Sequence, residues 1–186
     1  YLHYLDLTDA TIVANDYEYY TGCHTEDNVI GDNMLCNLSK LVSVKLPKNA
    51  TRIGNWALDG CRSLVEVVLP VKLELIGDNA FFNCRNLKSI DFPPTLKTIG
   101  SGAFRNCYCL EKISLPGVEN IGEIAFGGCN KLTEVRIPST LNSIKNSAFD
   151  SENLKNVYTY TVEPISIGQN TFNKTAYETA TLYIPK

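Results

Sequence analysis

The stretch Ile99-Gly-Ser-Gly-Ala-Phe-Arg-Asn-Cys-Tyr-Cys-Leu-Glu-Lys-Ile-Ser-Leu-Pro116 is one copy of a unit that recurs along most of this 186-residue chain. This copy opens with Ile-Gly, continues with Ala-Phe and a Cys, and closes with an alternating apolar run that ends in proline, and the other copies keep most of these positions. The opening isoleucines are spaced by 23, 23, 23, 22, 23 and 23 residues: Ile30, Ile53, Ile76, Ile99, Ile121, Ile144 and Ile167. A fixed period of this length indicates a solenoid, in which each coil buries its apolar face against its neighbours.

The apolar positions of one unit predict its local structure. Ile113 and Leu115 alternate with polar residues, which is the pattern of a strand with one buried face. The proline that follows has no N–H to donate and therefore ends the strand. Residues 96–100 predict a second, minor strand with a corner at its glycine. The spacing of Phe104 and Cys107 predicts one helical turn that faces inward. Coils stacked about 4.8 Å apart would pair these strands in parallel.

This pattern, Leu-x-x-Ile-x-Leu-Pro and then Leu-x-x-Ile-Gly-x-x-Ala-Phe-x-x-Cys, resembles the BspA-like leucine-rich repeats of bacterial surface proteins, also called the Treponema pallidum type. The resemblance implies an α/β leucine-rich repeat solenoid with a parallel sheet on its concave face and minor strands and short helical turns on the other side. We expect regular repeats over residues 30–150. Residues 151–186 are degenerate repeats or a cap, in which Glu152 takes the Cys position and Leu182 to Pro185 restores a last strand.

Residues 1–29 form an N-terminal coil that carries an insertion, and all three parts belong to one solenoid domain. Leu7 precedes Ile30 by 23 residues, whereas the equivalent Leu46 precedes Ile53 by only 7, so 16 residues are extra. They include the Tyr17 to Tyr20 run, Cys23 and His24. Because a terminal coil exposes its core unless something covers it, the insertion is predicted to be a capping loop, with the tyrosines as a possible lip to a binding surface.

The composition excludes several classes of partner. The 17 basic and 20 acidic residues give a net charge of -3, so the chain lacks the basic face that nucleic acid or an anionic membrane requires. No run approaches the roughly 20 apolar residues of a membrane span. No signal peptide is visible and the sequence begins at Tyr1, so we expect a segment of a longer protein.

Seven cysteines cannot all pair within one chain. Four of them, Cys61, Cys84, Cys107 and Cys129, keep the register of the repeat and predict a column of buried thiols that pack as small hydrophobes. A spacing of about 4.8 Å between coils exceeds the ~3.8 Å between the Cβ atoms of a relaxed disulfide, and a linear column does not suit tetrahedral zinc. Cys109 is expected to point outward as a free thiol. Whether Cys23 and Cys36 are bridged stays open.

The sequence offers no chemistry that predicts an enzyme. The two histidines are His3 and His24, and although His24 follows Cys23, no third group or oxyanion motif accompanies that pair. The phosphate loop, the dinucleotide fingerprint, the zinc-protease motif and the calcium loop are all missing from the sequence. We therefore expect no catalytic residues, no metal and no cofactor.

The outward residues of the predicted strands are the remaining candidates for function. They alternate with the buried pair of each coil and carry mixed charges and tyrosines, which suits recognition of a protein or peptide better than a polyanion. The predicted binding residues are Lys45, Glu66, Asp91, Lys112, Ser114, Glu134, Arg136, Tyr158 and Tyr183. The alternative is an ordinary solvated face.

Two functions follow from these readings. The resemblance implies a non-catalytic recognition module of a secreted or cell-surface bacterial protein, with a role in adhesion or in binding proteins of a host or of neighbouring cells. The alternative is a structural spacer or stalk without a ligand. The ligand and the oligomeric state are not encoded in any motif.

Overall fold

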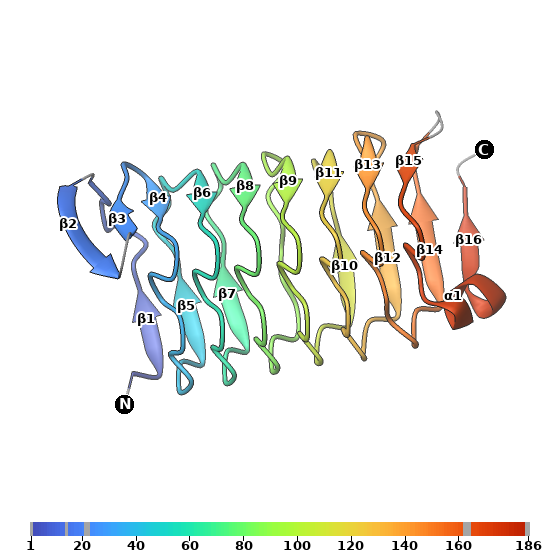
Figure 1. The fold of residues 1–186 in the computed structure, drawn as a ribbon, viewed down its shortest axis with the longest axis horizontal. Helices are drawn as coiled ribbons and strands as arrows, with labels where there is room; N and C mark the ends of the chain where they lie inside the picture. Colours follow the sequence, from blue (N-terminus) through green and yellow to red (C-terminus); the bar gives the residue numbers. More distant parts are fainter. Residues whose placement is uncertain (1, 14, 21–22, 162–164, 185–186) are drawn as a thin grey trace.

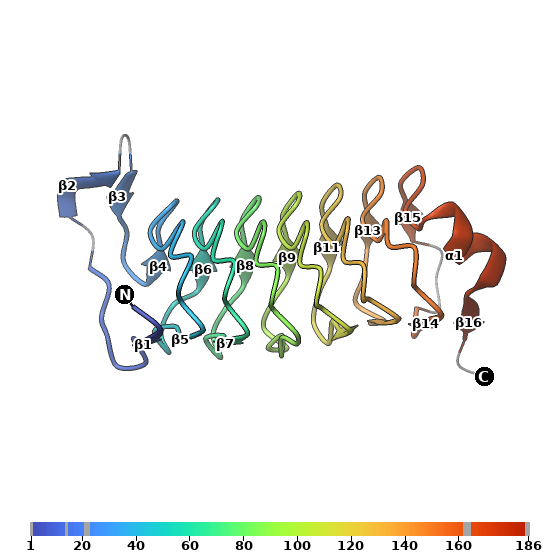
Figure 2. The same cartoon turned by 90° about the horizontal axis from the view of Figure 1, so that it is seen from below.

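The chain folds into a solenoid of parallel strands, described by a computed structural model over residues 2–13, 15–20, 23–161 and 165–184, with side chains described outside residues 14–25. Figures 1 and 2 show the coils stacked in a nearly straight row, with the long strands side by side along one face of the stack. The leucine-rich repeat solenoid predicted from the period is confirmed. None of the described residues lies in a helix with the length and apolar character that a membrane crossing requires.

The minor strands form one continuous ladder along the stack. They are the seven two-residue strands β4 (Val29–Ile30), β6 (Arg52–Ile53), β8 (Leu75–Ile76), β9 (Thr98–Ile99), β11 (Asn120–Ile121), β13 (Ser143–Ile144) and β15 (Ser166–Ile167). Each pairs in parallel with the equivalent strand of the next coil, and isoleucine always faces isoleucine. The repeated isoleucine therefore sets the register of the whole stack.

The major strands form two separate sheets instead of one. The N-terminal sheet holds β1 (Tyr4–Asp6), β5 (Ser43–Lys45) and β7 (Glu66–Val68). The C-terminal sheet holds β10 (Lys112–Ser114), β12 (Glu134–Ile137), β14 (Asn156–Thr159) and β16 (Thr181–Tyr183). The last of these confirms the strand predicted near Leu182. Residues 89–91, which lie between the sheets in sequence, form no strand although their alternating pattern matches the others.

The predicted helical turn between Phe and Cys is wrong, because the segment is a series of tight turns without a helix. Asn79 and Asn83 adopt left-handed backbone angles, with φ of 55° and 59°, which interrupt any helical hydrogen-bond pattern. Their N–H groups instead donate to the next coil, Asn79 to Ser101 at 2.9 Å and Asn83 to Arg105 at 3.0 Å. The turn segments thus form a third ladder of bonds between coils.

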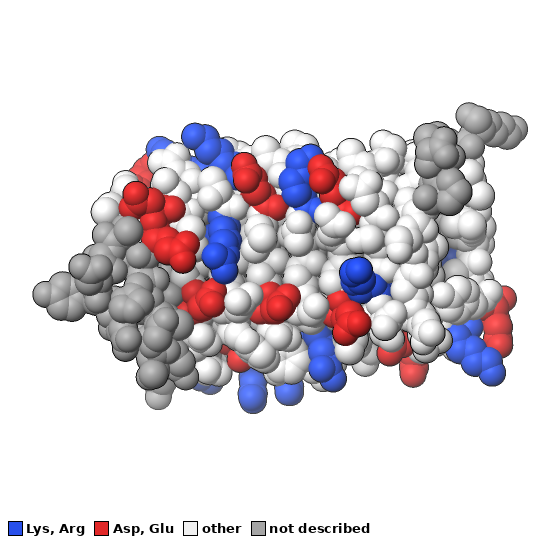
Figure 3. Space-filling view, turned by 45° about the horizontal axis from the view of Figure 1, so that its top comes forward, with Lys and Arg blue, Asp and Glu red and all other residues white. Residues whose placement is uncertain are grey.

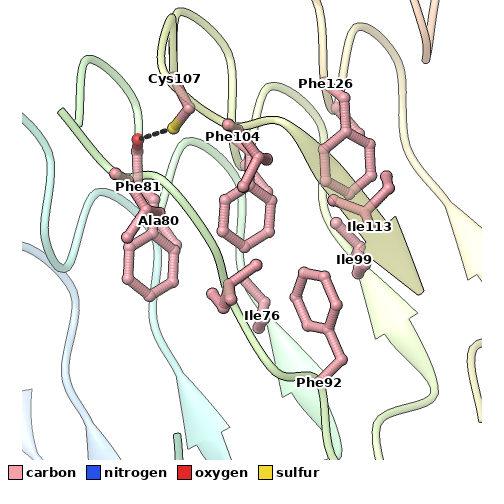
Figure 4. Close-up of a cluster of buried hydrophobic side chains, with 14 of the residues drawn as sticks. Ile76, Ala80, Phe81, Phe92, Ile99, Phe104, Cys107, Ile113 and Phe126 are labelled. Carbon is pink, nitrogen blue, oxygen red and sulfur yellow. Dashed lines mark hydrogen bonds between the residues drawn. The ribbon is translucent and has the colours of Figure 1, made fainter. Parts of the chain in front are cut away.

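The interior is a stack of identical side chains. Phe81, Phe104, Phe126 and Phe149 are fully buried, and successive rings lie nearly parallel with centroids 5.0 to 5.3 Å apart. Figure 4 shows three of these rings above the isoleucines of the minor strands. From Phe81 onward the neighbour of each ring is the same residue one coil away, whereas the first two coils have Leu35 and Leu58 at this position.

The predicted column of buried thiols is present, and it also satisfies the backbone. Each of Cys61, Cys84, Cys107 and Cys129 donates its S–H to a carbonyl of the preceding coil at 3.3 Å. Figure 4 shows the bond from Cys107 to the carbonyl of Phe81. Burial raises the pKa of all four thiols, that of Cys61 and Cys129 to about 12. Free Cys is thus both the small hydrophobe and the weak donor that this position needs.

The thiol column ends after Cys129, and the repeat pattern breaks at Glu152 as the sequence indicates. The neighbouring Ser151 is buried instead, and its hydroxyl donates to the carbonyl of Cys129 at 2.8 Å. Glu152 is exposed.

The glycine that follows most of these isoleucines has a different role from the predicted corner. A Cβ on Gly100 would lie 2.6 Å from the carbonyl carbon of Gly77 in the preceding coil, and Gly54, Gly77, Gly122 and Gly168 are equally crowded. These glycines do not have positive φ. Glycine therefore relieves the close approach of two backbones in these coils, although Lys145 takes the equivalent position after Ile144.

The two ends of the stack depart from the repeat. The N-terminal insertion forms an antiparallel hairpin of β2 (Asn15–Tyr20) and β3 (Cys23–Thr25), which Figures 1 and 2 place beyond β4. Its capping role stays a prediction, as does a lip formed by the tyrosines, whose side chains lie outside the described residues. At the other end, helix α1 (Lys174–Thr179) begins after Asn173, whose side chain accepts a hydrogen bond from the Thr175 N–H.

Candidate functional site

The outward surface of the major strands and of residues 89–91 between them, called here the strand face, carries all nine predicted binding residues. In its N-terminal part, the exposed charges of neighbouring strands form an ion pair. Lys45 Nζ lies 2.9 Å from a carboxylate oxygen of Asp6 across β1 and β5, and both side chains are exposed. Hydrogen bonds from Thr8 and then Lys45 hold the pKa of Asp6 well below its ordinary value. On β7, Glu66 and Val68 are exposed.

The strand face is interrupted at Ser89, Ile90 and Asp91. Regular coils have a bond such as that from the Leu46 N–H to Val68, at 3.1 Å. Within the described residues, no equivalent bond joins residues 89–92 to β7 or β10. The interruption therefore leaves backbone donors and acceptors of both sheets unpaired at this position.

The sequence after the interruption explains it locally. Phe92 replaces the Leu or Ile of other coils and packs edge to face on Phe104, with ring centroids 5.5 Å apart. Two prolines follow, Pro93 and Pro94, where other coils have one. Proline restricts the backbone of the residue before it and donates no N–H. The two prolines therefore disfavour regular strand pairing of residues 89–92 with the neighbouring coils. The next coil accommodates the extra proline with a glycine, because any side chain at Gly117 would place its Cβ against the Pro94 carbonyl oxygen.

A hollow of about 420 Å³ opens on the strand face at this interruption. Buried Ile90, Phe92 and Ile113 contribute an apolar lining. Five of the nine predicted residues line the same hollow: Asp91, Lys112, Ser114, Glu134 and Arg136. A second hollow of about 380 Å³ shares Ser114, Pro116 and Arg136 with it and is bounded on its far side by Ser139 and Tyr160. The structure thus brings these five residues together around one extended depression.

Arg136 is the centre of a linked cluster on this part of the face. Its Nε donates to Glu134 at 3.0 Å, and its guanidinium lies over the Tyr158 ring at 4.3 Å from the centroid. Tyr158 in turn stacks on Tyr183 at 4.3 Å. Lys112 reaches the same Glu134 at 3.9 Å. These contacts hold the guanidinium between an aromatic face and a carboxylate, an arrangement that fixes its direction.

The electrostatics of the cluster keep its charges and donors in place. Desolvation lowers the pKa of Arg136, but the hydrogen bond and charge of Glu134 outweigh it, so the pKa is raised and the guanidinium stays charged. Desolvation, with Tyr183 and Glu134 nearby, raises the pKa of Tyr158, so its phenol stays neutral. The site can therefore offer charged and neutral donors together at physiological pH.

Sequence reasoning missed one member of this cluster. The Tyr160 hydroxyl lies 3.4 Å from Arg136 Nη1, and its side chain is exposed at the second hollow. Tyr160 follows Tyr158 by two residues, which puts both on the same side of an extended chain. That spacing was the available signal. Lys45 and Glu66 lie on the other side of the interruption, in the N-terminal sheet, and line neither of the two hollows.

Other candidate chemistry finds no support among the described side chains. They contain no cluster of His, Cys, Asp and Glu that could hold a metal ion. Cys36 and Cys109 are half-buried free thiols. The side chains of Cys23 and His24 lie outside the described residues. Figure 3 shows acidic and basic side chains interspersed over the face in view, without a broad area of one sign.

Parallel coils with stacked interiors and a polar strand face define a leucine-rich repeat solenoid of the bacterial type. The chain belongs to the BspA-type leucine-rich repeat family, whose model matches residues 28–155 and 99–185 in 6 copies. No functionally curated protein matches the chain.

Solved structures of similar proteins agree with this membership. A Treponema pallidum leucine-rich repeat protein is 33% identical, with a TM-score of 0.69 over 74% of this chain and 64% of its own. A leucine-rich cell surface protein of Faecalibacterium prausnitzii is 28% identical, with a TM-score of 0.76 over 98% of this chain and 47% of its own. A Bacteroides ovatus leucine-rich repeat protein, 18% identical with a TM-score of 0.52 over 94% of this chain and 61% of its own, shares the fold. This chain thus spans less than two thirds of each.

Proposed function

We propose that this chain is a non-catalytic recognition module of a bacterial surface protein, and that it binds a protein or peptide at the double hollow around Arg136. The observation that carries the proposal is the interruption of the strand face at residues 89–91. There an apolar floor, unpaired backbone groups and a fixed charged cluster meet in one depression. Small interfaces depend on such anchored arginines and tyrosines around an apolar centre.

An extended peptide suits this depression better than a flat protein surface. A hollow of about 420 Å³ accepts one or two side chains, and unpaired strand groups beside it can bond a peptide backbone. Adhesion and an extracellular or cell-surface location are part of the proposal, supported by the description of the Faecalibacterium prausnitzii relative as a cell surface protein. Nucleic acid and membrane lipid are not proposed as partners, because the charges are balanced.

The experiment is a selection of binders from a random peptide display library against the purified chain. The proposal predicts that selected peptides lose at least tenfold in affinity when Lys112→Gln and Arg136→Gln are combined. The matched control combines Lys45→Gln and Glu66→Gln, which change the strand face outside the hollows and should leave the affinity unchanged. Equal losses in both variants, or none in either, would reject the site.

A structural spacer is the second candidate, favoured by one observation. The strand-face charges largely satisfy one another, as in the pairs of Lys45 with Asp6 and Arg136 with Glu134. A spacer predicts that no selected peptide binds the chain better than it binds an unrelated solenoid.

A further inference from the structure

The turn segments carry a second surface, which begins with a strained tryptophan. Trp56 has a φ of 58° and is 39% exposed. The equivalent positions also have positive φ and are mostly occupied by residues that tolerate it: Asn33, Asn79, Gly102, Ile124, Ser147 and Asn170. A left-handed backbone costs a bulky L-residue free energy that Asn or Gly largely avoids. The fold alone would therefore favour Asn at position 56, and the tryptophan calls for another explanation.

Trp56 is the first of a set of aromatic and arginine side chains on neighbouring turns. Its ring meets Phe82 edge to face, with centroids 5.8 Å apart. The Arg105 guanidinium lies over the Phe82 ring, 5.8 Å from its centroid. In the same two coils, Arg85 lies over Tyr108 at 5.7 Å. We name Trp56, Phe82, Arg85, Arg105 and Tyr108 the aromatic ridge.

The two arginines of the ridge differ from the ion-paired arginines elsewhere. Arg52 lies within 4.0 Å of Glu26, and Arg136 within 3.0 Å of Glu134. No described carboxylate lies at ion-pair distance from Arg85 or Arg105. Stacking on a ring orients a guanidinium and leaves its N–H edge open, and that edge matches a carboxylate in shape and charge.

Asp59 and Asp78 lie on the turns of the ridge coils, but neither pairs with Arg85 or Arg105. Asp78 accepts the Ser101 N–H at 2.7 Å as part of the bonding between coils. The described residues therefore supply no carboxylate to the two arginines, and their open N–H edges are free to bind one from another molecule.

We propose that the aromatic ridge binds an acidic segment of a partner protein, with carboxylates on Arg85 and Arg105 and an apolar side chain against Trp56. This surface is separate from the strand face and does not depend on ligand binding there. Trp, Tyr and Arg are the residues that dominate protein interfaces, and the ridge contains all three. Trp56 and Arg105 both contact Phe82, and Arg85 contacts Tyr108.

The test uses the fact that Trp56 is the only tryptophan of the chain, so its fluorescence reports the ridge directly. The probe is the acetylated and amidated peptide EEFEELEE, with the peptides QQFQQLQQ and KKFKKLKK as charge controls. We expect a saturable change in Trp56 emission with the acidic peptide, weakened by salt, and none with either control. No change with the acidic peptide, or equal changes with all three, would overturn the proposal.

Variants separate recognition from folding. Arg85→Gln with Arg105→Gln should weaken binding of the acidic peptide at least tenfold, while Lys40→Gln with Lys145→Gln, which removes two exposed charges away from the ridge and the hollows, should not. Trp56→Asn, followed by calorimetry, should also weaken binding tenfold but leave the unfolding temperature unchanged or raise it by up to about 4 °C, because the backbone strain is relieved. Wild-type affinity in Trp56→Asn, or an equal loss of binding in the Lys40→Gln and Lys145→Gln variant, would contradict the ridge as the site.

Discussion

The interior of the coils and the strand face share the same backbone period but differ in how far the sequence repeats. Inside, the phenylalanine stack and the thiol column recur with one residue type for several coils. Outside, equivalent positions change from Lys45 to Val68 to Arg136. An interior side chain packs against its own copies, so one solution serves every coil. An outward side chain meets solvent or a partner, and nothing in the stack makes it repeat.

The largest expected effect breaks the interior. Phe81→Ala removes a fully buried ring that stacks on Phe104, and should lower the free energy of unfolding by about 3–5 kcal/mol. The adjacent Phe82→Ala removes a half-buried ring on the outer turn and should cost only about 1 kcal/mol. Urea denaturation of both variants measures the difference. Similar losses would mean that interior and exterior are not energetically distinct.

The next effect tests the contact between coil backbones. Gly100→Ala places a methyl group against the backbone of the preceding coil and should cost about 1–3 kcal/mol, because backbone atoms cannot move aside cheaply. Ser101→Ala, one residue later, is the control and should change the unfolding midpoint little. An unchanged midpoint in Gly100→Ala would show that the coils separate more easily than their packing suggests.

The thiol column predicts a loss of stability in alkali. Burial raises the pKa of these cysteines from an ordinary value of 9.0, to about 12 for Cys61 and Cys129. A raised pKa stabilises the folded chain below pH 9.0, and this contribution is lost as the pH rises from there toward 12, where the unfolded chain has already released the protons. Urea midpoints at pH 7.5 and 10 should therefore differ less in a Cys61→Ala variant than in the wild type. The same slope in both would exclude the thiols as its source.

The smallest effect lies on the N-terminal part of the strand face. The lowered pKa of Asp6 stabilises the folded chain above pH 3.8, and this contribution is lost as the pH falls through the folded pKa. Asp6→Asn should be slightly less stable than the wild type at pH 7, and the difference should shrink at low pH and in 1 M salt because the pair is exposed. Thermal unfolding at pH 7 and pH 2.5 measures it, and a difference that grows in acid would contradict the assignment.

The same contrast explains how far the sequence alone could lead. The period predicted the coil, both strands and the thiol column, because each depends on residues that meet their own copies. A spacing of three between Phe104 and Cys107 fits a helix and a tight turn equally well, and only the left-handed asparagines distinguish them. Ser151 follows Cys129 by 22 residues instead of 23, so a fixed period of 23 assigns its buried position to Glu152.

The candidate site was harder to predict than the coil. Alternation placed Asp91, Lys112 and Arg136 on one face but could not show that the strand pattern at residues 89–91 fails to pair. That failure depends on Phe92 and two prolines downstream, whose effect is felt in the neighbouring coils. The hollow is therefore a property of three coils together and of none alone.

The divided sheet also has a mechanical meaning. A pull along the stack separates coils by opening ladders, and every junction between regular coils holds a major ladder, a minor ladder and the turn bonds. The junctions on either side of residues 89–91 lack the major ladder, so there the minor strands and the turns bear the tension. When the stack is pulled along its axis, it should extend first at this point, next to the hollow. A ligand that bridges β7 and β10 would stiffen the stack where it is weakest.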